Sequence, residues 1–333
     1  MIKKIINYLK EDIKENYVHY IILLFFILLI TIKFDYYVYS PGSLVDLTDR
    51  IEVENSNKSE GSFNLTYVTA RNGIIPNILL SHIIPSWDLV ELDKQRIENE
   101  SENEIVERDK VYLKETSYDA IIAAFEEAGK EYTVKNINVT ITHVFDIADT
   151  DLKVGDVIKK VNGVEINKFD DLKNEIDKYK ENDKIEIEVE RNNKNIKCYS
   201  ILKKEKDRII IGVSLAELKD IETNPKVKYI FKDNESGSSR GLMCALDIYN
   251  KITEFDLTKG RKISGTGTIN EKGEVGAIDG VKYKLAGAVK KKANIFIVPK
   301  DNYDEAIKLK KKYNYNIEII LADNLHNVIE KLK

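Results

Sequence analysis

A serine pair flanked by glycines is the segment of this 333-residue chain whose residue types best suit nucleophilic chemistry. Residues 237–241 read G-S-S-R-G and stand directly before an apolar stretch that predicts a helix over residues 242–252. The glycines permit tight turns and a close approach of substrate. Backbone N–H groups at a helix start can stabilise a developing oxyanion. Glycine and serine are also common loop and N-cap residues, so this segment alone does not establish a nucleophile.

Lys282, 43 positions after Ser239, is a candidate base for such a serine, although an arbitrary lysine among 52 basic residues usually lies at the surface. It lies in G-A-I-D-G-V-K-Y-K, ahead of an alanine-rich stretch that predicts a helix over residues 285–292. Lysine accepts a proton only when it is neutral, and its ordinary pKa is about 10.4. Burial must therefore lower the pKa substantially. The apolar neighbours that could provide this burial are Ala277, Ile278, Val281, Leu285 and Ala286.

Metal, nucleotide and disulfide chemistry find little support in the sequence. The four histidines are isolated, and no pair has metal-ligand spacing, so we expect no metal site. Cys198 and Cys244 are the two cysteines, which cannot by themselves form a disulfide framework or a cysteine-based zinc site. The pattern G-x-x-x-x-G-K-[ST] is absent, so we expect neither ATP nor another cofactor to be needed.

The overall composition is that of a globular chain of roughly two domains. Hydrophobic residues make up 43% and charged residues 32%. The 52 basic and 56 acidic residues give a formal net charge of −4, which argues against a nucleic-acid partner bound through phosphate neutralisation.

Three linked motifs resemble the proteolytic domain of Lon. They read G-S-S-R-G-L-M-C-A-L-D-I-Y-N-K-I-T, G-R-K-I-S-G-T-G-T-I and G-E-V-G-A-I-D-G-V-K-Y-K. Nearly the whole chain is similar to the ATP-independent, membrane-anchored, PDZ-containing Lon-like proteases of Gram-positive bacteria, of peptidase family S16 type. This resemblance implies a serine-type endopeptidase with a Ser/Lys dyad. It implies Ser239 as the nucleophile, Lys282 as the general base and Thr266 as the residue that orients the lysine.

The chain departs from the family pattern G-P-S-A-G on both sides of the nucleophile. Ser238 and Arg240 occupy the flanking positions, so two adjacent serines leave the nucleophile ambiguous by residue type, and the register of the motif favours Ser239. We expect Arg240 to face solvent or substrate. We expect the backbone N–H groups around Gly237, Ser238 and Arg240 to stabilise the oxyanion.

Residues 131–205 predict a compact β-rich domain. The run G-D-V-I-x-x-V-N-G before F-D-D-L resembles a bacterial PDZ domain. In such domains an exposed strand edge beside the main helix takes up peptide as an added strand. The resemblance implies a groove between residues 141–148 and the helix, with these lining residues: Ile141, His143, Val144, Leu172 and Ile176.

Residues 17–32 contain no Asp, Glu, Lys or Arg and predict a membrane helix. At about 1.5 Å per residue this stretch spans roughly 24 Å, less than a bilayer core of about 30 Å, so we expect the helix to continue past Lys33 to residue 39. No A-x-A site follows, which favours an uncleaved anchor. Four lysines precede the span, against Lys33 and Arg50 after it, which favours a cytoplasmic N-terminus and an outside catalytic domain.

The fold class that follows is an α+β multidomain protein, with a transmembrane helix, a PDZ-like β-rich domain and a Lon-type proteolytic α/β domain. We expect a cytoplasmic segment over residues 1–16, a transmembrane helix over 17–39, a β-rich region with a charged helix over 40–130, a PDZ-like domain over 131–205 and a proteolytic domain over 206–333.

The function that these features favour is processing of exposed or secreted peptides and proteins at the outer face of the cell membrane. The partners would be a peptide or unfolded protein and the membrane, with homo-oligomer formation left open. One alternative is a catalytically inactive PDZ adaptor on a Lon-like scaffold. Another is a protease that depends on a separate ATPase subunit.

Overall fold

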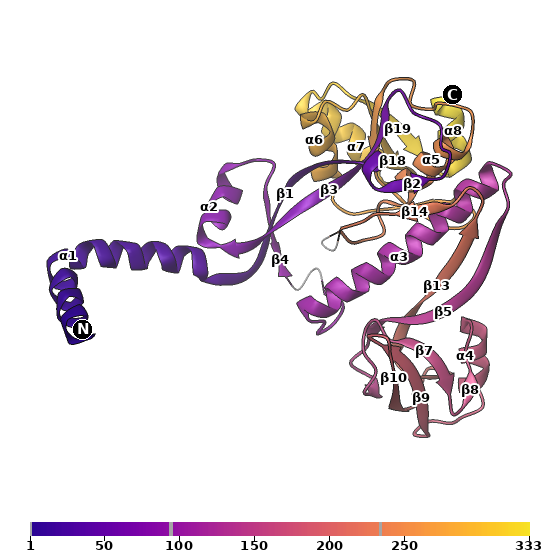
Figure 1. Cartoon of the computed structure of the whole chain (residues 1–333), viewed down its shortest axis with the longest axis horizontal. Helices are drawn as coiled ribbons and strands as arrows, with labels where there is room; N and C mark the ends of the chain where they lie inside the picture. The colour runs from indigo at the N-terminus through magenta and orange to yellow at the C-terminus, as the bar shows by residue number, and fades with distance from the viewer. Residues whose placement is uncertain (1, 93–95, 233–234) are drawn as a thin grey trace. The chain divides into compact units, whose positions relative to one another are not determined.

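The computed structural model describes residues 2–92, 96–232 and 235–333 (Figure 1). The chain forms two compact units, each described here by itself. The first unit comprises residues 1–41 and 68–95, and the second comprises residues 42–67 and 96–333.

The first unit begins with the long helix α1 (Ile2–Thr31), which departs from helical geometry at Asn16. The strand β1 (Lys33–Asp46) follows, and its first half pairs antiparallel with β4 (Asp88–Glu91). The end of β3 (Ser62–Ile74) leads into the short helix α2 (Ile75–Ile83).

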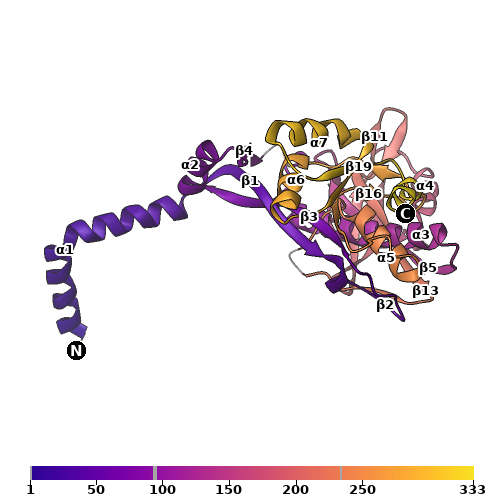
Figure 2. The same ribbon diagram turned by 90° about the horizontal axis from the view of Figure 1, so that it is seen from above.

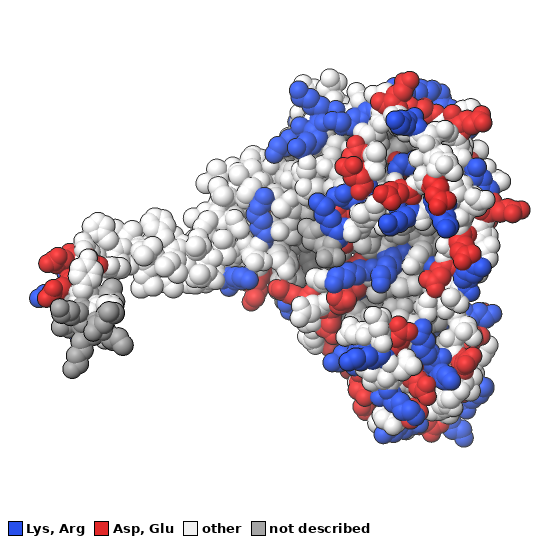
Figure 3. All heavy atoms as spheres, in the orientation of Figure 1, with Lys and Arg blue, Asp and Glu red and all other residues white. Residues whose placement is uncertain are grey.

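The prediction that the membrane helix continues to residue 39 is wrong, because α1 ends at Thr31. The aromatic residues beyond it lie on β1, in keeping with the strand preference of tyrosine, phenylalanine and valine. The helix gains length from its N-terminal side instead. Its stretch Lys10–Thr31 has 22 residues with a mean hydropathy of 1.7, and its apolar part has no buried residue. By length and composition this stretch can cross a membrane, although a signal sequence would meet the same criteria (Figure 3).

A parallel sheet forms the centre of the second unit. Its strand order is β19–β18–β15–β3, with β15 (Lys262–Gly265), β18 (Ile295–Pro299) and β19 (Glu318–Ala322) all parallel to their neighbours. The strand β18 is buried on both sides, because Ile295 and Ile297 point into one hydrophobic core and Phe296 and Val298 into another. This division follows from the two-residue period of a strand.

Helices cover both faces of this sheet. The helices α5 (Gly241–Ile252), α8 (Leu325–Leu332) and the C-terminal half of α3 (Glu102–Glu127) share the larger core with Ile295 and Ile297. The helices α6 (Val281–Lys290) and α7 (Lys300–Tyr313) pack over the smaller one. Short elements complete this part: η1 (Leu47–Asp49), β2 (Ile51–Val53) paired with β14 (Val227–Tyr229), and β16 (Thr268–Ile269) paired with β17 (Val275–Gly276).

The helix α3 is one continuous helix of 26 residues and corresponds to the charged helix predicted within residues 40–130. Ser101 caps its start through a capping box with Glu104. Gly129 adopts φ +62° just after its end, as expected for a C-cap glycine.

A seven-stranded antiparallel sheet follows α3, in the order β13–β5–β7–β9–β10–β6, with β8 paired to β7. Asn162 and Gly163 form the hairpin turn between β7 and β8, and both residues have positive φ. The elements are β5 (Tyr132–Val144), β6 (Asp149–Thr150), β7 (Val157–Val161), β8 (Val164–Glu165), α4 (Phe169–Ile176), β9 (Lys184–Arg191), β10 (Lys194–Ile201), β11 (Lys203–Glu205), β12 (Arg208–Ile210) and β13 (Val213–Thr223).

The domain order predicted from the sequence differs from the structure. Phe63 and Phe125, from the region predicted as separate, share a core with Leu246 of α5. The antiparallel domain is therefore inserted into the α/β domain, between α3 and β14. Its last strand ends at Thr223, beyond the predicted boundary at residue 205. Periodicity identifies elements, but it does not say which distant element each will contact.

We expect Leu246→Ala to lower the free energy of unfolding by about 2–5 kcal/mol, because the leucine is fully buried in the larger core and truncation leaves a cavity. Urea unfolding of the detergent-solubilised chain, followed by far-ultraviolet circular dichroism, measures the change in the free energy of unfolding. Val164→Ala, at an exposed position, is the control; an equal loss from both variants would contradict the assignment of Leu246 to the core.

Candidate active site

Ser239 lies in the turn that leads into α5, where a serine side chain can approach a substrate. Gly237 has φ +89°, a conformation that a glycine adopts without strain. Gly241, the first residue of α5, lies so close to Thr116 of α3 that an added Cβ would come within 2.4 Å of the threonine hydroxyl oxygen. The two glycines around the serine therefore serve different needs: Gly237 allows a positive φ, and Gly241 leaves room for Thr116.

Lys284 is the lysine that contacts this serine. Its Nζ atom lies 3.0 Å from the Oγ atom of Ser239 and 3.2 Å from the Oγ1 atom of Thr266. Its side chain projects from the first turn of α6, which begins directly after Gly280. The lysine is 6% exposed, so the contact lies in a largely dry environment.

The sequence-based choice of Lys282 as the base is corrected by this geometry. The helix α6 begins at Val281, four residues before the predicted start, so both lysines lie on it. Residues two apart on a helix point about 200° apart, because each residue turns the helix by about 100°. Lys284 is therefore directed to Ser239, whereas Lys282 is half-buried elsewhere and its Nζ atom lies 5.6 Å from the Tyr283 ring centroid.

Thr266 connects the lysine to the backbone of the serine. It is fully buried, and its hydroxyl donates a hydrogen bond of 3.0 Å to the carbonyl oxygen of Ser239. Because the hydroxyl proton is used in that bond, the Thr266 oxygen acts as the acceptor in its contact with Lys284. A neutral amine that donates one N–H to Thr266 still has a lone pair for the hydroxyl proton of Ser239. The expected orienting contact of Thr266 is present, directed to Lys284 instead of Lys282.

Burial lowers the pKa of Lys284 to about 8, and the negative charge of Asp279 acts in the opposite direction. Relative to the ordinary value of 10.5, this shift corresponds to about 3 kcal/mol against the charged form. A substantial fraction of the amine is therefore neutral at mildly alkaline pH.

The backbone near the serine offers N–H groups for an oxyanion, although not from every residue expected. The N–H of Gly237 donates to the carbonyl of Asp109, which makes this glycine unsuitable as a donor. Among the described residues, no protein acceptor takes the N–H of Ser239 or Arg240. These two groups lie at the N-terminus of α5, where the helix dipole favours negative charge.

Ser238 and Arg240, the departures from the family pattern, have different surroundings from Ser239. The carbonyl of Ser238 accepts hydrogen bonds from Thr116 and from the N–H of Gly241. The guanidinium of Arg240 pairs with Glu235 at 3.3 Å and lies 4.5 Å from the Phe231 ring centroid.

The expectation that Arg240 faces solvent is therefore wrong, whereas its contact with substrate stays a prediction. Its side chain is only 10% exposed and bonds to the carbonyl of Ser236 as well as to Glu235. Glu235 also accepts a hydrogen bond from Arg50, so one carboxylate holds two arginines. Sequence reasoning assigned Glu235 no role, and no local signal connects it with residue 50.

The cysteines show no sign of nucleophilic activation. Burial raises the pKa of Cys244 to about 12 and that of Cys198 above its usual range, so both favour the thiol. Within the described ranges, no group of three or more His, Cys, Asp or Glu is arranged to hold a metal ion.

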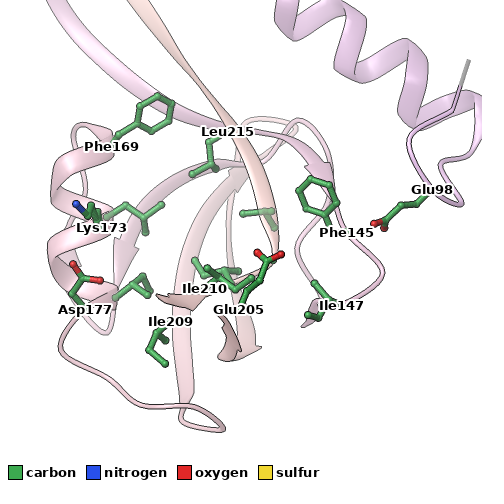
Figure 4. A pocket seen from close by; sticks show the side chains of 15 residues that line it. Glu98, Phe145, Ile147, Phe169, Lys173, Asp177, Glu205, Ile209, Ile210 and Leu215 are labelled. Atoms are coloured by element: carbon green, nitrogen blue, oxygen red, sulfur yellow. The ribbon is translucent and has the colours of Figure 1, made fainter. Parts of the chain in front are cut away.

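A second candidate site is a groove of about 750 Å³ in the inserted domain (Figure 4). Side chains of α4 line one side, including Phe169, Leu172 and Ile176, and residues 209–213 with Leu215 line the other. The N–H of Phe169 donates to Glu217 of β13, which ties α4 to this strand. The expected lining residues Leu172 and Ile176 are both present.

The prediction that Ile141, His143 and Val144 line this groove is wrong. All three lie on β5, which pairs with β13 on one side and β7 on the other and so has no free edge beside α4. Ile141 and His143 are buried, and none of the three lines the groove. The edge strand is β13, whose residues Val213 and Leu215 do line it.

Comparison with known proteins identifies two domain families in the second unit, with boundaries that differ from those of the cores, because one match begins within α3 and the other within β10. A PDZ domain family model matches residues 118–199, and a model of the Lon protease (S16) C-terminal proteolytic domain matches residues 198–333. The chain carries a PDZ domain and a Lon-type proteolytic domain. Both matches, and the α+β architecture with an N-terminal apolar helix, agree with the predicted fold class.

The Lon-type domain also has relatives among individual proteins. Two proteins described as Lon protease homolog 2, peroxisomal, from Caenorhabditis briggsae and Caenorhabditis elegans are each 29% identical to it, over 126 and 119 residues. These matches cover 37% and 36% of this chain and 15% of each relative. The chain thus spans only a small part of the length of these relatives.

Solved structures similar to the chain correspond to single small domains. One is the PDZ domain of an SdrC-like protein from Listeria monocytogenes, with 24% identity, coverage of 25% of this chain and 92% of that chain, and a TM-score of 0.23. Another is a Geobacillus thermodenitrificans protein, with 20% identity, coverage of 23% and 94%, and a TM-score of 0.21.

We expect Phe169→Glu to weaken peptide binding by about tenfold, because a charge would replace an apolar side chain at the mouth of the groove. Fluorescence anisotropy with labelled random-sequence peptides measures the affinity, in a chain that also carries Ser239→Ala to prevent cleavage. Val164→Glu, exposed on β8 outside the groove, is the matched control; similar losses for both variants would count against the groove.

Proposed function

We propose that the chain is a membrane-anchored, ATP-independent serine endopeptidase in which Ser239 is the nucleophile and Lys284 the general base. The observation that carries the proposal is the 3.0 Å contact between the Nζ atom of Lys284 and the Oγ atom of Ser239 in a largely buried setting. A lysine with a lowered pKa beside a hydroxyl nucleophile is an arrangement that can activate serine at moderate pH.

The reaction proceeds in two acyl-transfer steps. Neutral Lys284 takes the hydroxyl proton of Ser239 as the oxygen attacks the scissile carbonyl. The N–H groups of Ser239 and Arg240 stabilise the oxyanion, and protonated Lys284 then donates its proton to the leaving amine. Lys284, neutral again, activates a water molecule that releases the acyl group from Ser239. Thr266 keeps the amine directed at the serine throughout.

Substrate capture involves the PDZ groove. A peptide adds to the free edge of β13, and its side chains enter the apolar space between this strand and α4. The sequence has no P-loop pattern to drive unfolding, so the substrates are flexible or already exposed segments.

Anchoring by α1 sets the place of the reaction. With Lys3 and Lys4 ahead of the stretch Lys10–Thr31, and Lys10 and Lys14 in its first turns, the N-terminus lies in the cytoplasm and the catalytic domain lies outside. Exposed or secreted peptides and proteins at the outer face are then the substrates.

We expect Ser239→Ala and Lys284→Met each to abolish cleavage, because one removes the nucleophile and the other the base. Lys282→Met, on the same helix turn, is the matched control and should retain most activity. Ser238→Ala separates the two adjacent serines and should also remain active. Cleavage of a fluorogenic flexible peptide measures the rates, with circular dichroism to verify folding.

Three results would contradict this proposal. A Lys282→Met variant that is inactive while Lys284→Met is active would restore the original choice of base. A correctly folded chain that cleaves no peptide, but loses peptide binding when Phe169 is changed, would favour the inactive adaptor. Activity that appears only with a partner ATPase and ATP would favour the third reading.

We expect kcat/KM to rise with pH and to level off above pH 8, because the reactive form is the neutral amine and its pKa is about 8. Only about a tenth of this amine is neutral at pH 7. Asp279 raises this pKa, so Asp279→Asn should move the profile to lower pH. A profile that falls through pH 8, or a shift to higher pH in Asp279→Asn, would contradict Lys284 as the base.

A further inference from the structure

Residues 72–87 form a second stretch of the chain without Asp, Glu, Lys or Arg. The run N-G-I-I-P-N-I-L-L-S-H-I-I-P-S-W lies between Arg71 and Asp88 and includes the whole of α2. Such a composition is unusual in a chain in which 32% of residues are charged. The segment belongs to the first compact unit, together with α1.

Three apolar side chains of α2 are exposed. Leu79, Leu80 and Ile83 are 59%, 39% and 73% exposed, and α2 has no buried residue. Residues three and four apart are neighbours on a helix, so Ile83 adjoins both Leu80 and Leu79, and the three form an apolar surface, which we call the α2 face. An exposed apolar surface of this kind marks a site of interaction.

The α2 face continues from the apolar end of α1. The two helices are in contact, and both views show α2 beside the C-terminal end of α1 (Figures 1 and 2). Ile30, Ile32 and Phe34, where α1 gives way to β1, are 58%, 43% and 45% exposed. The surface that a lipid bilayer would cover on α1 therefore extends toward α2.

The residues at the edge of this surface suit the boundary between lipid and water. The guanidinium of Arg71 lies 4.7 Å from the Trp87 ring centroid, and the rings of Tyr37 and Tyr39 are stacked. Tryptophan and tyrosine are enriched at membrane interfaces, where an apolar ring and a polar group are both satisfied. A cation close to the interface also favours anionic lipid.

We propose that α2 is a second membrane contact, with Leu79, Leu80 and Ile83 inserted at the boundary between headgroups and acyl chains. The proposal rests on α1 being the membrane anchor of the proposed function. The occupant is a lipid surface because the α2 face continues from a helix able to span the bilayer and because no charged residue interrupts residues 72–87. A helix on the surface and a spanning helix together hold the first unit at the membrane by two contacts.

Single-cysteine labelling of the full chain in phosphatidylcholine–phosphatidylglycerol vesicles tests the proposal. Leu79→Cys and Ile83→Cys would carry the environment-sensitive fluorophore NBD, and lipids with a nitroxide group would act as quenchers. Phe25→Cys in α1 reports on the anchor, and Val164→Cys reports on an exposed position of the PDZ domain. The natural cysteines are both buried, so the unsubstituted chain gives the background labelling.

We expect strong quenching at Phe25→Cys, clear quenching and a blue-shifted emission at both α2 positions, and neither at Val164→Cys. Quenching at Phe25→Cys without quenching at the α2 positions would overturn the α2 contact and leave the anchor intact. A loss of quenching at all positions would overturn both. Disulfide crosslinking between copies at Leu79→Cys, without lipid quenching, would assign the α2 face to a second copy of the chain and overturn the lipid contact.

Discussion

The contact of Lys284 with Ser239 depends on keeping an amine nearly dry and still hydrogen-bonded. Burial makes the charged form unfavourable, and Thr266 supplies an acceptor for the neutral form. That acceptor is available because the threonine proton is committed to the serine carbonyl, and the N–H of Gly267 donates to the same carbonyl. The strand β15, which ends just before Thr266, thus aligns both members of the pair. The parallel sheet is the support from which this alignment follows.

The second support is α3, which reaches the serine turn from the opposite direction. The carbonyl of Asp109 accepts the N–H of Gly237, and the hydroxyl of Thr116 bonds to Ser238. The same helix leads through Gly129 to β5 of the PDZ domain. The serine turn is therefore held by one element of the sheet and by one helix that adjoins the insertion, which makes α3 part of the candidate site.

Much of this arrangement could be predicted from local sequence, and the errors have identifiable causes. The serine turn, Thr266, the hairpin at Asn162-Gly163 and the strands β9 and β10 follow from motifs or from turn residues and alternation. The base was misplaced by two residues because the face on which a helical side chain lies depends on where α6 begins and how it docks, and both depend on tertiary packing. The groove was assigned to β5 because alternation marks a strand without showing which of its edges is paired. Arg240 was placed at the surface because its partner Glu235 and the second arginine, Arg50, meet only after folding.

The chain enters and leaves the inserted PDZ domain at two residues that lie next to each other. Tyr132 of β5 and Thr223 of β13 are paired across the sheet, so the chain departs and returns at nearly the same point. Partners in an antiparallel ladder have Cα atoms about 5 Å apart, a gap that a tight turn can bridge. The host domain could therefore have acquired or lost this module in one genetic event without rearranging its own core. A shortened chain in which a tight turn joins residues 132 and 223 is a natural route to a Lon-type domain without the insertion.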